Sequence, residues 1–299
     1  MDHTLYAYSA LPRRAPQPFA PGPGLVAHVV LFLEHWELLP PEGALRDPRM
    51  VGEFGSFTPD YRSWTQHEYG LRVGIFRVID ALREAGIRPV IAANAMALQR
   101  LPRLVQLFTD WGCEWLGHGL AATRMVHARM GLEEQDAMLR ESLDVLAQAT
   151  GVQPMGWVSQ DWGTTPDTAS LLAGAGVRYT LDWCNDDQPF WMHTDPPLLA
   201  VPLSAEWDDV QCQWLRHVEP RAHAELAAGA FEQMHAECVQ QQRNAVFGLA
   251  LHPWVCGMPS RIAALRSLLQ RLRASAGVHW LTPQQIFCNL RGDPARGLS

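Results

Sequence analysis

The sequence predicts an α/β protein built on a parallel sheet that closes, or nearly closes, into a (β/α) barrel. Apolar runs typical of buried strands alternate about seven times with segments at helical spacing, and the connections are short. The first run, LVAHVVLFL at 25–33, is continuously apolar, as in parallel strands covered on both faces. Period-2 hairpins and internal repeats do not stand out, and no linker divides the chain. We therefore expect a single domain.

The elements follow in order from local patterns. A Pro-rich stretch at 10–24 predicts an extended arm, and the Pro- and Gly-punctuated segment 37–66 predicts a long loop of the functional kind. Apolar residues at helical spacing predict a helix at 70–85 that stops at Gly86, and the amphipathic segment 132–150 predicts a helix closed by Gly151. Further strands are expected at 88–93, 114–117, 155–158, 178–182, 198–202, 246–251 and 278–281, and further helices at 101–111, 166–175, 222–243, 261–275 and 283–290. The predicted division is an arm at 1–24, the barrel domain at 25–290 and a tail at 291–299.

Polar residues gather directly after the predicted strands. In barrels of this kind the chemistry sits on the loops at the carboxyl ends of the strands, so these side chains are expected to converge. The candidates are Glu34 and His35, Asn94, His118, Ser159 to Asp161, the run Asn185, Asp186 and Asp187, then Ser204 and Glu206, and finally His252.

Each of the main candidates has an ordinary structural alternative. Glu34 could face water at a strand end, but nine mostly apolar residues precede it, and a carboxylate near a core needs a partner or a task. His118, between two glycines, could be a turn residue, although glycines also let the backbone approach a ligand. His252 could be a hydrogen-bonded core histidine. Simple turn chemistry explains 185–187 equally well.

Composition excludes several classes of protein. The net charge is −7, and no basic cluster exceeds Arg13-Arg14, which argues against a nucleic-acid partner. Every basic residue is Arg, so neither a Schiff-base lysine nor a Walker-type phosphate loop is available. The sequence has no G-x-S-x-G nucleophile elbow, which argues against a serine hydrolase. Six scattered Cys, no signal-peptide pattern and no apolar stretch of about 18 residues predict a cytoplasmic protein that does not cross a membrane.

Several segments together resemble the polysaccharide deacetylase superfamily, also called the NodB-homology or carbohydrate esterase family 4 type. They are LFLEHWE, YGLRVG, EWLGHG, the stretch from PMGWVSQ to DWCNDDQPF, and LHPWVCGMPSR, and they span about 25–290 in the expected order. The branch most similar contains allantoinases and cyclic imidases. The resemblance implies a distorted (β/α)7 barrel, related to the TIM barrel.

The resemblance also implies roles for individual residues. The family's first motif holds a base and a metal ligand, and Glu34 and His35 stand in their places. His118 matches the first histidine of the metal-binding H-x-x-x-H motif, whereas the second position is Ala122. His252 resembles the family's general acid, and the Arg that steadies the base has no match. With only His35 and His118 as metal ligands, the expectation is no required cofactor, or a weakly bound divalent metal such as zinc.

These observations lead to three hypotheses. The first is a hydrolase of non-peptide C–N bonds in a linear or cyclic amide, ureide or imide, with Glu34 activating water, His118 assisting at the carbonyl oxygen and His252 protonating the leaving nitrogen. The second is a metal-dependent N-deacetylase of an acetylated sugar, and the third is a degenerate homologue that binds a small ligand without turnover. Trp36, Trp157, Trp162 and Trp254 are expected to wall the pocket, with Asn185, Asp186, Asp187 and Glu206 binding substrate. The arm and the long loop could serve an interface between identical subunits.

Overall fold

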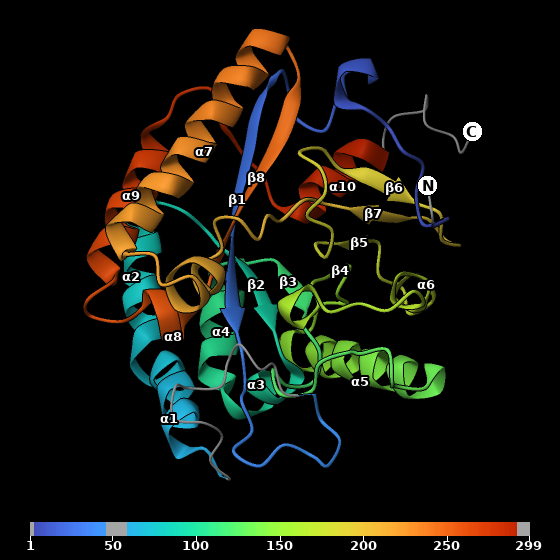
Figure 1. Cartoon of the computed structure of the whole chain (residues 1–299), viewed down its shortest axis with the longest axis vertical. Coiled ribbons are helices and arrows are strands. Elements are labelled where there is room, and N and C mark those ends of the chain that lie inside the picture. The colour runs from blue at the N-terminus through green and yellow to red at the C-terminus, as the bar shows by residue number, and fades with distance from the viewer. Residues whose placement is uncertain (1–2, 46–58, 292–299) are drawn as a thin grey trace.

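The computed structural model describes residues 3–45 and 59–291, and its centre is a nine-stranded sheet (Figure 1). Seven strands run parallel in the order β7-β5-β4-β3-β2-β1-β8, β9 pairs with β1, and β6 pairs antiparallel with β7. The strands are β1 Gly24–Leu33, β2 Val90–Ala93, β3 Trp115–Gly117, β4 Gly156–Trp157, β5 Tyr179–Thr180, β6 Phe190–Met192, β7 Leu198–Ala200, β8 Asn244–Leu251 and β9 His279–Trp280. This arrangement confirms the predicted single-domain, distorted (β/α)7 barrel.

Helices cover the outside of the sheet. In Figure 1 the long strands β1 and β8 lie side by side, with α7 and α9 packed against each other on their outer face. The helices are α1 Tyr61–Tyr69, α2 Ile75–Glu84, α3 Ala95–Arg100, α4 Pro102–Asp110, α5 Leu132–Thr150, α6 Thr168–Gly174, α7 Pro220–Gln241, α8 Pro253–Cys256, α9 Ile262–Ala274 and α10 Pro283–Arg291. Shorter turns are η1 Leu11–Arg13, the π-helical η3 Gly70–Gly74, η4 Gln160–Trp162 and the π-helical η5 Val210–Leu215.

Two local predictions were wrong. The helix predicted from Gly70 begins at Tyr61, because Asp60 caps its first turn by accepting from the Ser63 backbone N–H at 3.0 Å, so the predicted loop 37–66 is too long. Part of that loop, and all of the predicted tail except Arg291, lie outside the described residues. The hairpin of β6 and β7 was also missed, because a three-residue strand is too short to show a period of two.

Side chains of β1 alternate between the two faces of the sheet, and this alternation decides which residues point toward the site. Leu25, Val29 and Leu33 face the covering helices, whereas Val26, Val30 and Phe32 point into the barrel. Successive side chains of a strand point to opposite faces, so continuing the pattern directs Glu34 into the mouth of the barrel and His35 away from it.

Two glycines let a helix approach the site closely. A Cβ at Gly70 would lie 2.7 Å from Trp254 Cβ, and one at Gly74 would lie 2.3 Å from the Pro253 carbonyl oxygen. Only glycine allows η3 to contact α8 at these positions, and α8 follows directly on His252. The YGLRVG segment therefore packs closely against α8, which carries the pocket residue Trp254.

Candidate active site

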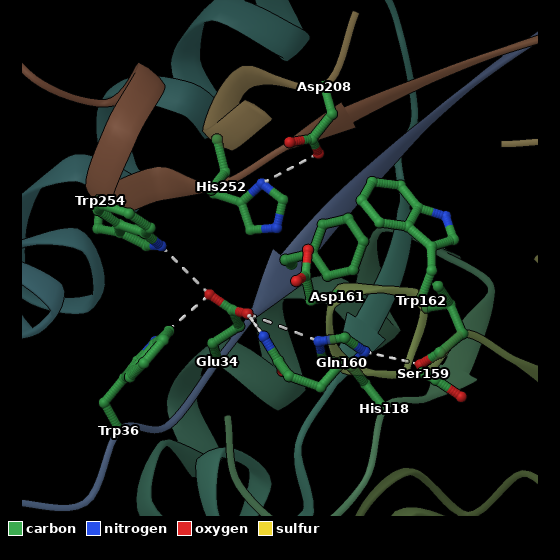
Figure 2. Close-up of a pocket in the computed structure, with 13 residues that line it drawn as sticks. Glu34, Trp36, His118, Ser159, Gln160, Asp161, Trp162, Asp208, His252 and Trp254 are labelled. Carbon is green, nitrogen blue, oxygen red and sulfur yellow. Dashed lines mark hydrogen bonds and ion pairs between the residues drawn. The ribbon is translucent and has the colours of Figure 1, made fainter. Parts of the chain in front are cut away.

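A pocket at the carboxyl ends of the strands brings together Glu34, His118 and His252. These residues follow β1, β3 and β8, so three distant parts of the chain meet at one end of the barrel. Figure 2 shows them around a common space. The pocket has a volume of about 30 Å³, room for about two water molecules, and it opens to solvent. Its walls are Phe32, Glu34, Trp36, His118, Val158, Ser159, Gln160, Asp161, Trp162, Asp208, Val210, His252 and Trp254.

Glu34 is buried and held by N–H donors. Gln160 Nε2 donates to Glu34 Oε1 at 2.6 Å, and the indole N–H groups of Trp254 and Trp36 point at Oε2 from 3.2 and 3.4 Å. Burial alone would raise the pKa of this carboxyl. The neighbouring His118, the charge of His252 and the Gln160 hydrogen bond outweigh burial and hold the pKa well below its ordinary value. Glu34 is therefore a carboxylate throughout the neutral range.

His118 points one ring nitrogen into the pocket. Its Nδ1 lies 2.7 Å from the Val158 carbonyl oxygen, a contact that requires Nδ1–H to donate. Its Nε2 is buried, has no hydrogen-bond partner among the described residues, and lies 3.6 Å from Glu34 Oε1. With a proton on both nitrogens, the ring could donate from Nε2 to an oxygen placed in the pocket.

The Asp209 carboxylate holds His252 through two hydrogen bonds. Asp209 Oδ1 lies 2.6 Å from His252 Nδ1, and Asp209 Oδ2 accepts from the His252 backbone N–H at 2.9 Å. Phe32 stacks on the imidazole with ring centroids 4.3 Å apart. Burial would lower the pKa of His252, but the charges of Asp209 and Asp208 outweigh it and raise the pKa to about 10. The imidazole is therefore protonated at neutral pH.

Asp208 and Asp209 were missed from the sequence. Asp208 Oδ2 lies 3.6 Å from His252 Nδ1 and has no hydrogen-bond partner among the described residues. Burial, together with the charge of Asp209, raises the pKa of Asp208 to about 7, although the charge of His252 opposes the shift. The two residues immediately precede η5, and Asp208 lies eight residues beyond the end of β7 at Ala200. The available signal was an adjacent acidic pair in WDDV within a Trp-rich segment.

Several residues expected to bind substrate lie elsewhere. Trp157 is in the core and donates its N–H to Ser159 Oγ, whereas Trp36, Trp162 and Trp254 do line the pocket. Glu206 is exposed and pairs with Arg216 at 3.2 Å.

The run 185–187 lies at the opposite end of the barrel. The Asp187 carbonyl accepts from the Val246 backbone N–H near the start of β8, about 20 Å along the strand from His252. Asp186 forms an ion pair with Arg14 at 2.6 Å, and Asn185 contacts Tyr6. These residues anchor the N-terminal arm.

The residues at the family's metal position do not fit a zinc ion. His35 turns away from the pocket, its Nδ1 3.4 Å from Arg100 Nη1, beside the Arg100–Glu68 ion pair. Ala122 offers no ligand atom, so His118 and Glu34 are the remaining candidate ligands in the pocket. Glu34 already accepts from N–H donors. Catalytic zinc needs about three protein ligands, so this set is incomplete. Asp208, Asp209 and His252 could together hold a cation, but His252 Nδ1 and Asp209 Oδ1 are bonded to each other, and an ion would have to break that bond.

Comparisons with known proteins agree with the resemblance found in the sequence. The chain is 21% identical over 243 residues to a peptidoglycan deacetylase of Helicobacter pylori, covering 72% of this chain and 82% of that protein. No family model matches the chain.

Solved structures share the fold. The crystal structure of a Puue allantoinase superposes with a TM-score of 0.83 at 23% identity, covering 95% of this chain and 96% of the other. A probable polysaccharide deacetylase from Pseudomonas aeruginosa superposes with a TM-score of 0.79 at 23% identity, covering 94% and 96%. The predicted similarity to the polysaccharide deacetylase superfamily is thereby confirmed.

Proposed function

We propose that this chain, which has the fold shared by polysaccharide deacetylases and an allantoinase, hydrolyses carbon–nitrogen bonds other than peptide bonds in a linear or cyclic amide, ureide or imide. The observation that carries the proposal is the pairing, in one pocket, of a buried carboxylate with a buried imidazolium. The protonation states of Glu34 and His252 at neutral pH are those that a base and an acid require.

The mechanism assigns one step to each side chain. Glu34 takes a proton from a water molecule as that water attacks the carbonyl carbon. His118, when both ring nitrogens carry a proton, donates from Nε2 to the carbonyl oxygen as negative charge develops there. His252 gives its Nε2 proton to the leaving nitrogen, so that the C–N bond breaks to give a neutral amine. Asp209, bonded to Nδ1, keeps the imidazole oriented through both steps.

An N-acetylated sugar is a second candidate substrate, favoured by the descriptions of the deacetylase relatives. Purified protein assayed on ureides, cyclic imides and N-acetylated sugars, with Glu34→Gln measured alongside, tests the proposal and ranks the classes. Release of amine by the wild-type chain and its loss in Glu34→Gln support a hydrolase. Saturable binding without turnover of any class would instead identify a ligand-binding homologue.

The proposed reaction requires no metal, and this gives a prediction about metal content. We expect elemental analysis of the purified chain, after dialysis against a chelator, to find well under one zinc ion per chain, because the donor set around Glu34 and His118 is incomplete. One zinc per chain retained through dialysis would contradict this prediction.

The charges around His252 also predict the pH dependence of catalysis. The active form has ionised Glu34 and protonated His252, so kcat/KM should fall as the pH rises through about 10. In Asp209→Asn the largest charge that raises the His252 pKa is removed, and this alkaline limb should move down toward the ordinary value near 6.5. Rate profiles of both proteins measure the shift, and an unchanged limb would show that another group donates the proton.

A further inference from the structure

The segment that follows β4 contacts both the proposed base and His118. The Val158 carbonyl oxygen lies 2.7 Å from His118 Nδ1, and Gln160 Nε2 donates to Glu34 Oε1 at 2.6 Å (Figure 2). Ser159 stands between these two residues in the chain. The position of its backbone therefore decides where the carbonyl that orients the imidazole and the amide that orients the carboxylate both lie.

The Asp182 carboxylate holds Ser159 from the neighbouring strand. Asp182 lies two residues beyond the end of β5, which pairs in parallel with β4. Its Oδ1 accepts from the Ser159 backbone N–H at 2.5 Å, and its Oδ2 accepts from the hydroxyls of Ser159 and Thr180, each at 2.9 Å. Three donors thus fix one carboxylate, and two of the three belong to Ser159.

Asp182 is buried, and it is not one of the residues that line the pocket around Glu34. Burial raises the pKa of the Asp182 carboxyl, although the bonds from Ser159 and Thr180 and the charge of His118 oppose the rise. A carboxylate removed from water needs partners or a task. The bonds to Ser159 supply both, because they fix a segment whose residues on either side contact groups of the proposed reaction.

The turn that Ser159 begins needs such an anchor. Asp161 and Trp162, which follow Gln160, have φ values of 49° and 53°, in the left-handed region that residues other than glycine seldom adopt. Backbone of this kind persists where the surrounding structure holds it. The Ser159 N–H, bonded to Asp182, is the fixed point immediately before Gln160.

We propose that Asp182 is a positioning residue, which acts through the Ser159 backbone on the alignment of Glu34 and His118. This inference rests on the proposed function for the roles of Glu34 and His118, whereas the contacts themselves exist without turnover. Misplacement of a reacting group by about 1 Å can lower a rate by about 100-fold. Loss of the Asp182 carboxylate is therefore expected to lower kcat and to change KM little, because Asp182 does not line the pocket.

Two substitutions at residue 182 test the proposal. In Asp182→Ala the Ser159 N–H loses its acceptor, and kcat should fall by about 10- to 100-fold while KM stays within a few-fold of wild type. In Asp182→Asn the amide oxygen still accepts from the Ser159 N–H, so kcat should recover most of that loss. Initial rates on the best amide substrate measure both constants. Should Asp182→Ala fail to fold, Asp182→Ser replaces it, because its hydroxyl is one bond shorter than the carboxylate and can still bond Thr180.

A matched control lies on the same strand. Tyr179 donates its hydroxyl to the Glu114 carboxylate at 2.7 Å, so Tyr179→Phe also removes a hydrogen bond to a carboxylate and leaves the bonds of Ser159 intact. This variant should lose stability, as Asp182→Ala does, and keep kcat within a few-fold of wild type. The midpoint of thermal unfolding, measured for both variants, shows whether the loss of rate follows the loss of stability or the loss of the Ser159 anchor.

The tautomer of His118 gives a readout that does not need hydrolysis. The contact with the Val158 carbonyl requires a proton on Nδ1, so the neutral ring should carry its proton there in the wild type and in Asp182→Asn. In Asp182→Ala the carbonyl is no longer held, and a ring with its proton on Nε2 should appear. Nitrogen NMR shifts of the imidazole distinguish the two forms, and His118→Asn assigns the signals by their loss.

Three outcomes would overturn the inference: an unchanged kcat in Asp182→Ala, a loss of kcat that Asp182→Asn does not restore, or a His118 tautomer that stays the same in Asp182→Ala. Equal losses of kcat in Asp182→Ala and Tyr179→Phe would also overturn it, because they would show a purely structural role. If the wild-type chain hydrolyses no amide while the tautomer follows residue 182, the proposed function fails and the positioning role stands.

Discussion

Glu34→Gln is expected to lower kcat/KM by about 10²–10⁴-fold while the chain stays folded, because the substitution keeps the shape of the side chain and removes its capacity to take a proton. The single amide oxygen could accept from the donors on only one side, either Gln160 or Trp254, so stability has to be measured together with activity. Initial rates on the best substrate, together with the midpoint of thermal unfolding, separate loss of chemistry from loss of structure.

A matched control for this variant lies three residues away. Glu37 is paired with Arg124 at 2.6 Å and does not line the pocket, so Glu37→Gln should leave kcat/KM within a few-fold of wild type. If Glu34→Gln retained full activity on the true substrate, the base would have to be another pocket carboxylate, and Asp208 and Asp161 would be the next to test.

His252→Asn is expected to cost a similar factor, about 10²–10⁴-fold, because the leaving nitrogen loses its proton donor. The double variant Glu34→Gln with His252→Asn should lose far less than the product of the two factors, since each group acts only when the other has done its part. Initial rates of the two single variants and the double variant complete the cycle. Factors that multiply would mean that the two residues act independently, and the shared mechanism would be wrong.

The order of elements was predictable because the strands of a parallel barrel are buried on both faces, and such strands are recognisable as apolar runs in the sequence. Buried strands such as β1 and β8 are unbroken apolar runs, and both were expected within about two residues of their actual bounds. Elements set by a single side chain or by very few residues were not predictable. The cap at Asp60 and the hairpin of β6 with β7 are of this kind.

The site was predictable as far as strand ends define it. Glu34, His118 and His252 each follow a buried strand directly, and the structure brings them into one pocket. The period of two along β1 already implies that His35 points away from Glu34, a signal available in the sequence and not used.

Two adjacent acidic pairs could not be assigned to different ends of the barrel from the sequence alone. Asp186-Asp187 and Asp208-Asp209 look alike in the sequence, and both follow a strand. The first pair lies at the amino end of β8, where it anchors the arm, and the second holds His252. Only the course of the chain between β5 and β8 distinguishes them, and long-range packing decides that course.

The central claim is that Glu34 and His252 hydrolyse a C–N bond without a metal ion. The most direct measurement is kcat/KM of one preparation on its best amide substrate before and after exhaustive chelation, with the metal content determined in parallel. We expect an unchanged kcat/KM in the metal-free protein. A loss of activity on chelation that zinc or another divalent ion restores would contradict it.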